Sequence, residues 1–219
     1  MISTAEKRGS RVLIQGLTKS YSGEAAVDSI DLDINPGEFM TLLGPSGSGK
    51  TTTLNMVAGF VEPDSGTLSI DNLSLLGMPA RKRGIGMVFQ NYALFPHMTV
   101  AENIAFPLRQ RKVPRGERRA KVQAALDTVR LPGMSDRYPG QLSGGQQQRI
   151  ALARAIVFEP SVLLMDEPLG ALDRSLRDSM QLEIRRIHRE VGSTVLFVTH
   201  DQEEALALSD RIAVFNHGR

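Results

Sequence analysis

The stretch Phe39-Met-Thr-Leu-Leu43, followed at once by Gly44-Pro-Ser-Gly-Ser-Gly-Lys50-Thr51, decides the fold of this chain. The first five residues are an apolar run that predicts a buried strand. The glycine-rich residues after it lead into a predicted helix from Lys50 to Ala58, which we expect to end at Gly59. A strand, a glycine-rich loop and a helix in this order are typical of a phosphate-binding P-loop.

The residue types in this loop suit an anion. Glycines let successive backbone N–H groups converge on one anion, and the N-terminus of the following helix adds its positive end. Lys50 can place a point charge on the β- and γ-phosphates of a nucleotide, and the Thr51 hydroxyl can ligate Mg²⁺. The alternative is a glycine-rich turn with a surface lysine, but it does not account for the flanking strand and helix. The sequence therefore predicts a site for ATP with Mg²⁺.

A second apolar strand, Val162-Leu-Leu-Met-Asp166-Glu167, ends in two carboxylates. A buried carboxylate is costly unless it meets a cation, so Asp166 is predicted in the shell of the Mg²⁺ ion. Glu167 can face the γ-phosphate and orient or deprotonate the attacking water. The alternative is that both are surface acids at a strand end. Beside a P-loop, the pair favours a catalytic site for ATP hydrolysis.

The distribution of apolar runs predicts the fold class. Runs at residues 39–43, 85–89, 162–165 and 194–198 are nearly continuous, which is typical of parallel strands covered on both faces. Predicted helices at 50–58 and 174–191 lie between them, so we expect an α/β fold with a mostly parallel sheet flanked by helices. Residues 12–34 and 66–72 predict shorter strands in an antiparallel β layer. No buried strand is predicted in 91–160, which we interpret as an inserted helical sub-domain. The chain is thus expected to be one domain, 1–219, with a core of residues 1–90 and 161–219.

Composition excludes several classes of function. The 219 residues include no cysteine, so disulfides, thiolate metal sites and cysteine nucleophiles are excluded. The net charge of +2 does not by itself indicate nucleic acid. Residues 1–11 lack the apolar core of a signal peptide, and no stretch approaches the roughly 18 apolar residues of a membrane span. We expect any membrane role to come through a partner.

Leu142-Ser-Gly-Gly-Gln146 stands directly before a helix predicted from Gln147 to Phe158. Ser143 is a good N-cap, and the glycines after it leave backbone N–H groups bare at a helix start, which makes a second anion site. Together with the P-loop and Asp166-Glu167, this motif makes the chain resemble the nucleotide-binding subunits of ABC transporters. The resemblance covers essentially the whole chain and implies a P-loop NTPase core with ATPase activity.

The resemblance implies roles for individual residues. The motif at 142–146 closes over the γ-phosphate of ATP bound to another subunit, either a second copy or a paralogous ATPase, so two chains sandwich two ATPs head to tail. Gln90 resembles the glutamine that contacts Mg²⁺ or water, and His200 the histidine that bonds the γ-phosphate. Asp173, in Gly170-Ala-Leu-Asp173, resembles an aspartate that crosses the dimer interface, although the family usually has serine at the position of Gly170. The implied nucleotide contacts are Gly44, Pro45, Ser46, Gly47, Ser48, Gly49, Lys50, Thr51, Thr52, Ser143, Gly144, Gly145 and Gln146.

Tyr21 lies upstream of the P-loop, where the family places an aromatic side chain that stacks on adenine. It could equally be a core or edge aromatic. Residues 91–97, Asn-Tyr-Ala-Leu-Phe-Pro-His, are apolar for a loop. They either belong to the sub-domain core or, as the resemblance implies, Tyr92, Leu94 and Phe95 form part of a groove that receives a helix of the membrane subunit.

Residues 47–53, 91–97 and 199–205 together are most similar to the bacterial importer branch for polyamines, opines, ferric iron and thiamine, with spermidine or putrescine the first expectation. The implied partners are transmembrane permease subunits and, indirectly, a solute-binding protein. The implied location is the cytoplasmic face of the plasma membrane. Members of this branch continue into a β-rich C-terminal regulatory domain, which is expected to be absent here.

A basic cluster occupies the predicted helical insertion. It comprises Arg109, Arg111, Lys112, Arg115, Arg118, Arg119 and Lys121. A solvated helix face is the simpler interpretation, and we expect no nucleic-acid partner. The rival function, a soluble ABC-type ATPase that acts on nucleic acid or the ribosome, would use this cluster as its contact. A small-molecule kinase fits less well, because residues 142–146 would then have no role.

Overall fold

The computed structural model describes residues 9–170 and 172–219, so most of the N-terminal segment considered above for a signal peptide lies outside the described residues. The chain divides into two compact units. The described part of the first unit consists of residues 9–85, 161–166 and 192–219. The second consists of residues 86–160 and 167–191, without residue 171.

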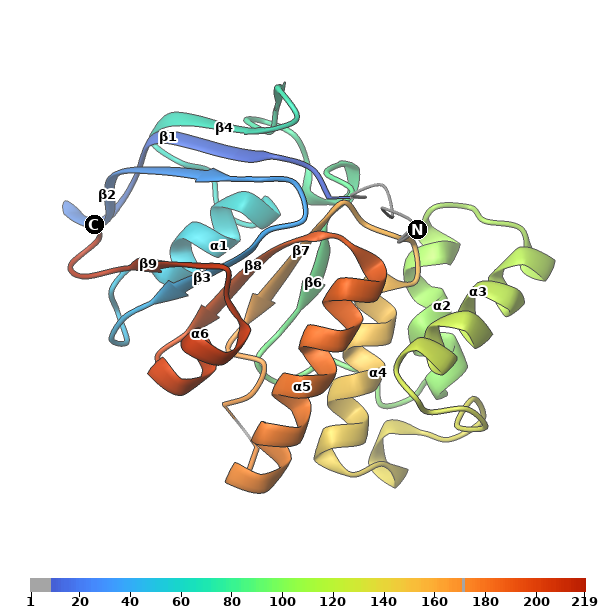
Figure 1. Ribbon diagram of the computed structural model, residues 1–219. Coiled ribbons are helices and arrows are strands. Elements are labelled where there is room, and N and C mark those ends of the chain that lie inside the picture. The colour runs from blue at the N-terminus through green and yellow to red at the C-terminus, as the bar shows by residue number, and fades with distance from the viewer. Residues whose placement is uncertain (1–8, 171) are drawn as a thin grey trace, which may run out of the picture. The chain divides into compact units, whose positions relative to one another are not determined.

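A parallel sheet forms the centre of the first unit (Figure 1). Its strands run in the order β7-β8-β3-β9. Their bounds are Val162–Asp166 for β7, Thr194–Thr199 for β8, Phe39–Leu43 for β3 and Arg211–Val214 for β9. Every residue of β8 is buried, as expected for a strand covered on both faces. Helices α1 (Lys50–Ala58) and α6 (Gln202–Leu208) pack on this sheet.

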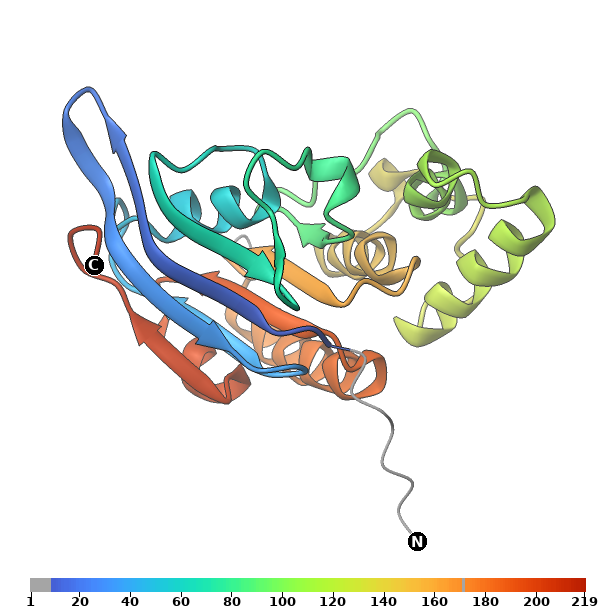
Figure 2. The same ribbon diagram turned by 90° about the horizontal axis from the view of Figure 1, so that it is seen from above.

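An antiparallel sheet forms a second layer of this unit, in the order β2-β1-β4-β5. The bounds are Glu24–Ile34 for β2, Val12–Tyr21 for β1, Ser65–Ile70 for β4 and Leu73–Ser74 for β5. Figure 2 shows β1 and β2 as the two long blue strands. A short 3-10 helix, Ala80–Lys82, follows β5. Buried Leu17, Ile34 and Leu68 come from this layer, while Phe39 and Phe197 of the parallel sheet pack with ring centroids 5.7 Å apart.

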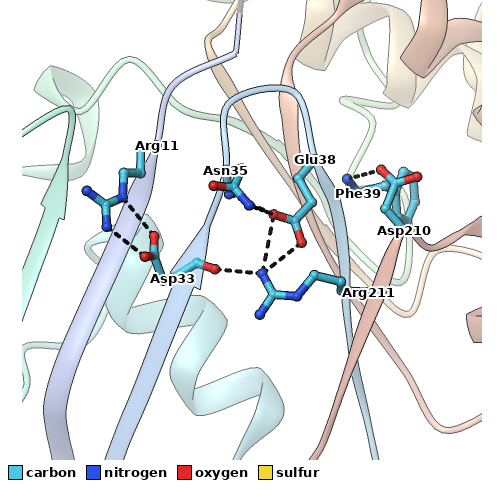
Figure 3. A network of polar contacts seen from close by, with 7 residues as sticks. All are labelled: Arg11, Asp33, Asn35, Glu38, Phe39, Asp210 and Arg211. Carbon is cyan, nitrogen blue, oxygen red and sulfur yellow. Dashed lines mark hydrogen bonds and ion pairs between the residues drawn. The ribbon is translucent and has the colours of Figure 1, made fainter.

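A polar network joins the turn between β2 and β3 to strand β9 (Figure 3). The buried carboxylate of Glu38 accepts hydrogen bonds from the backbone N–H of Asn35 at 2.7 Å and from Arg211 at 3.0 Å. The Phe39 N–H donates to Asp210 at 2.9 Å. Because Phe39 is the first residue of β3, this network sets the start of the strand that leads to the P-loop.

The second unit is mainly helical. Its elements are β6 (Gly86–Val88), α2 (Val100–Gln110), α3 (Arg115–Thr128), the 3-10 helix Pro139–Gln141, α4 (Gly144–Ile156) and α5 (Arg174–Val191). A capping box between Thr99 and Glu102 begins α2. Helix α4 packs against both α2 and α3. In the described parts of the chain, no helix has the length and apolarity needed to cross a membrane.

The structure confirms the predicted fold class, with a parallel sheet, flanking helices and an antiparallel layer. Helices α1 and α5 have the predicted bounds, and Gly59 ends α1 in the left-handed conformation with φ 84°. Several details differ. Residues 12–34, expected as shorter strands, form the two longest described strands, and the helix predicted to end at Phe158 ends at Ile156. The strand predicted at 85–89 contains only Gly86–Val88. The helix predicted from Gln147 begins three residues earlier, at Gly144, because Ser143 is its N-cap.

Candidate functional site

The P-loop joins β3 to α1 in the first unit. Gly49 is the N-cap of α1 with φ 101°, no side chain caps this helix end, and no acidic residue lies in its first turn. The first N–H groups of α1 can therefore bind an anion. A Cβ atom at Gly44 would overlap the carbonyl oxygen of Phe215, which lies just after β9. Glycine is thus required at position 44 by a close backbone approach.

The Lys50 side chain lies inside the P-loop and hydrogen-bonds to three of its residues. Its buried ammonium donates to the carbonyl oxygens of Gly44 at 2.8 Å and Pro45 at 2.7 Å, and to the Ser48 hydroxyl at 3.3 Å. These contacts hold the charge at the centre of the loop, where the phosphates of a nucleotide would meet it. The Gly218 N–H donates to the Ser48 carbonyl at 3.1 Å, so the residues after β9 support the loop from its other side.

Strand register places the P-loop and two candidate residues at the same end of the parallel sheet. Leu43 of β3 is paired with Thr199 of β8, and Asp166 of β7 with Val198. The P-loop, Asp166 and His200 therefore all leave the sheet at its carboxyl end, where α/β proteins bind their ligands. The Thr51 hydroxyl donates to Asp166 at 3.1 Å, which joins the start of α1 to β7.

This edge fits a nucleotide with its magnesium ion. Among the described residues there is no group of three or more His, Cys, Asp or Glu side chains that could hold a metal. Mg²⁺ with a nucleotide needs no such group, because it takes one or two protein oxygens and completes its shell with phosphate and water. The Thr51 hydroxyl and the Asp166 carboxylate, already in contact, supply such oxygens.

His200 and Tyr21 occupy exposed positions in the first unit. His200 lies between β8 and α6, and Asp201 caps α6 by accepting from the N–H groups of Glu203 and Glu204 at 2.8 and 3.3 Å. Tyr21 ends β1 and is 50% exposed, with the Lys19 ammonium 5.6 Å from its ring centroid. Tyr21 therefore lies outside the core, at the end of a strand that runs between β2 and β4, and its stacking on adenine stays a prediction.

Gln90 and Glu167 meet in the second unit. The Gln90 side-chain amide donates to a Glu167 carboxylate oxygen at 3.4 Å. Glu167 has φ 41°, a left-handed conformation that is unfavourable for a non-glycine residue and is common at functional sites. A Cβ atom at Gly170 would lie 4.0 Å from the same carboxylate oxygen, so the smallest residue stands beside this group.

The motif at 142–146 forms the start of α4. Ser143 and Gln146 make a reciprocal capping box, in which the Gln146 N–H donates to the Ser143 hydroxyl at 3.4 Å and the Ser143 N–H to Gln146 at 3.0 Å. A Cβ atom at Gly145 would come within 2.8 Å of Leu176 of α5, so glycine permits the close packing of these helices.

Asp173 and the apolar segment 91–97 have local structural roles. The Asp173 carboxylate accepts from the Leu176 N–H at 3.0 Å and so caps α5. Tyr92 is buried, whereas Leu94 and Phe95 are half-buried. Tyr92 therefore belongs to the core, and of the three apolar residues proposed for the groove only Leu94 and Phe95 can contribute to a surface.

Two buried polar residues of the second unit, Asn103 and Arg154, are absent from the candidates taken from the sequence. Both hold segment 92–99 through its backbone. Two signals were available in the sequence: Asn103 lies in a largely apolar predicted helix, and Arg154 lies between two alanines. Sequence alone, however, does not give the direction in which either side chain points.

Comparison with known proteins gives the family. The sequence model described as ABC transporter matches residues 27–170. The chain therefore belongs to the ABC transporter family. It is 58% identical over 212 residues to the spermidine/putrescine import ATP-binding protein PotA of Thermobifida fusca, covering 95% of this chain and 55% of that protein. Identity to the protein of the same name from Rubrobacter xylanophilus is 54% over 225 residues, covering 99% of this chain and 60% of that protein. The chain thus spans little more than half the length of these relatives.

The fold agrees with solved structures of this family. The dimeric post-hydrolysis state of the ATP-binding cassette MJ0796, bound to ADP and Pi, is similar with a TM-score of 0.83 and 34% identity. The match covers 94% of this chain and 95% of that one.

Proposed function

We propose that this chain binds ATP with Mg²⁺ and hydrolyses it as the motor subunit of a membrane importer. The observation that carries the proposal is the common sheet edge, at which the uncapped P-loop helix, Lys50 and the Thr51–Asp166 pair occur together. We infer the division expected from the sequence, in which residues 1–90 and 161–219 hold the nucleotide and residues 91–160 form a helical sub-domain, although residues 86–90 and 167–191 group with the helical unit. The ADP and Pi in the similar cassette MJ0796 support this assignment.

The proposed nucleotide contacts use the geometry of the first unit. The backbone N–H groups of the P-loop and the Lys50 ammonium bind the phosphates. Thr51 and Asp166 hold Mg²⁺, which neutralises phosphate charge when it is bound. Tyr21 stacks on adenine, and His200 donates to the γ-phosphate. The remaining proposed contacts are Pro45, Ser46, Gly47, Ser48 and Thr52.

Glu167 acts as the base in the proposed reaction. A water oxygen forms a bond to the γ-phosphorus while the bond between that phosphorus and the ADP oxygen breaks. Glu167 accepts the proton that the water loses. Gln90, in contact with Glu167, orients that carboxylate and the water. Replacement of the base should therefore stop turnover without removing the ATP contacts.

Residues 142–146 and Asp173 are proposed to act across a dimer. Ser143 and the glycines after it present the start of α4 to the γ-phosphate of ATP bound by a second copy, or by a paralogous subunit. The dimeric state of the similar cassette supports this proposal. The binding energy of two ATP molecules would shift the chains from an open to a closed state, and hydrolysis would reopen them.

The transported solute is proposed to be a polyamine, on the strength of the two relatives named for spermidine and putrescine import. Permease subunits would bind this chain at the cytoplasmic face of the membrane, with Leu94 and Phe95 in the contact. A nucleic-acid role is less favoured, because several members of the basic cluster have partners within the chain. The Arg111 guanidinium lies 3.5 Å from the centroid of the Phe158 ring, and Lys121 pairs with Glu159 at 3.2 Å.

The test is Glu167→Gln, with molar mass measured by light scattering with and without Mg-ATP. We expect a monomer that becomes a dimer only with ATP and a rate of hydrolysis reduced by orders of magnitude. Glu159→Gln, an exposed acid of the same unit, is the control and should keep its hydrolysis. A Glu167→Gln chain that still hydrolyses ATP at the original rate would refute the role of this residue. One that binds ATP but stays monomeric would refute ATP-driven closure by this chain alone.

A further inference from the structure

The segment after Gln90 is held by a buried arginine of helix α4. Arg154 donates from Nη1 to the Ala93 carbonyl at 2.7 Å and from Nη2 to the Tyr92 carbonyl at 2.8 Å. Its guanidinium also lies 5.7 Å from the centroid of the Phe95 ring. Two adjacent carbonyls are therefore bound by the two arms of one planar group, which fixes their direction as well as their distance.

The other end of the segment is held from α2. The Asn103 side-chain oxygen accepts from the Phe95 N–H at 2.8 Å, and its nitrogen donates to the carbonyls of Phe95 and Met98 at 3.1 and 3.2 Å. Asn103 is fully buried. The segment is thus attached to two helices of the same unit, at its start by Arg154 and at its end by Asn103.

The conformation that Arg154 holds is unfavourable in isolation. Tyr92 has φ 61° and Ala93 has φ 46°, so two successive non-glycine residues are left-handed. Such residues persist only where the surroundings impose the conformation. The carbonyls that Arg154 binds belong to these two residues, so its hydrogen bonds restrain this turn directly, together with the backbone bonds from the Tyr92 and Ala93 N–H groups.

Arg154 is costly to bury. It is 9% exposed, burial lowers its pKa, and no carboxylate in residues 9–170 or 172–219 forms an ion pair with it. A buried charge without a charged partner is a poor way to gain stability, for which an apolar side chain of similar size would serve better. Its double hydrogen bond to the turn is the feature that an apolar residue could not replace.

We propose that Arg154 is a positioning residue that couples segment 91–97 to the start of α4. Ser143 caps the same helix on which Arg154 lies, and a helix of this length transmits movement as a rigid rod, here over about 16 Å. Movement of the segment would therefore be passed to the residues that face ATP on a second chain. This inference rests on the proposed function, in which the segment faces the membrane subunit.

A fluorescent label on the segment tests the coupling. Since the chain has no cysteine, His97→Cys gives a single labelling site at an exposed position. In the Glu167→Gln background, Mg-ATP should produce both a dimer and a change in fluorescence. Added Arg154→Met should leave dimer formation intact but remove most of the fluorescence change, because the turn at Tyr92 and Ala93 is no longer bound to α4.

Two further variants separate coupling from folding. Arg154→Lys keeps the charge but cannot span both carbonyls, so an intermediate fluorescence change is expected. Arg149→Met, on the same helix and half-exposed, is the matched control and should keep the full change. If Arg154→Met does not dimerise, Arg154→Lys decides in its place: a dimer with a reduced change supports the coupling.

Distinct results would overturn this inference and the proposed function. A full fluorescence change in Arg154→Met or Arg154→Lys dimers, or a labelled parent that dimerises without any change, would overturn the coupling and leave the ATPase site intact. A labelled parent whose melting temperature does not rise with Mg-ATP would instead refute the proposed nucleotide site.

Discussion

Asn103→Leu is the substitution whose cost can be worked out most fully from the structure. Leucine has a similar shape to asparagine but can neither donate nor accept a hydrogen bond. The Phe95 N–H would lose its side-chain acceptor at 2.8 Å, and the carbonyl of half-buried Met98 would lose its side-chain donor at 3.2 Å. The Phe95 carbonyl would still accept from the Met98 N–H at 3.2 Å, so it would not be left unsatisfied.

The expected loss of stability follows from this count. A buried donor without a partner costs about 1–3 kcal/mol, and the Phe95 N–H is the donor left in this state. For a chain of this length, each kcal/mol lowers the melting temperature by about 2–4 °C. We therefore expect Asn103→Leu to lower the melting temperature by about 2–12 °C, since the two ranges multiply.

Thermal and urea unfolding, followed by circular dichroism, measure this effect. His97→Ala in the same segment is the control, since His97 is exposed and its loss should change the melting temperature by less than about 2 °C. An Asn103→Leu chain as stable as the parent would refute the view that segment 95–99 depends on this buried amide.

Three further substitutions test other features. Lys50→Ala should abolish the rise in melting temperature that Mg-ATP causes by mass action, because the charge at the centre of the P-loop is lost. Gly44→Ala should also abolish ATP binding, since the new Cβ would overlap the Phe215 carbonyl, whereas Gly116→Ala, with open space around it, should not. Burial raises the pKa of Glu183, but the hydrogen bond and charge of Arg186 outweigh it and hold the pKa below its usual range. The ionised Glu183 carboxylate stabilises the folded chain, and this contribution is lost as pH falls through the lowered pKa of the folded state. Below about pH 4, Glu183→Gln should therefore show a smaller fall in the free energy of unfolding, measured with urea, than the parent.

The strands and long helices were predictable because their patterns reflect burial. The run Thr194–Val198 has no polar interruption, and β8 is fully buried as that pattern requires. Helix α5 shows apolar residues at helical spacing and has the predicted bounds from Arg174 to Val191. The start of α4 was misplaced because its first residues are glycines, and the Ser143 cap outweighs their low helix propensity.

Side-chain direction was the part that sequence could not supply. Tyr92 and Phe95 are both aromatic residues of one apolar loop, yet Tyr92 is buried and Phe95 is half-exposed. The residue types do not distinguish these two positions. The left-handed turn at Tyr92 and Ala93 sets the directions of their side chains, and sequence alone does not reveal that turn. The roles of Gln90, Glu167 and His200 stay predictions until the variants above are measured.

The approach of residues 215–219 to the P-loop has a consequence for anyone who shortens this chain. Gly218 hydrogen-bonds to Ser48 and to Asp28, and Arg219 pairs with Asp28 at 2.6 Å, so the last five residues act as a brace behind the loop. Removal of residues 215–219 would leave every motif of the sequence intact but would remove the hydrogen bond that supports Ser48 of the P-loop. A fragment intended to keep the P-loop geometry should therefore retain residues 215–219.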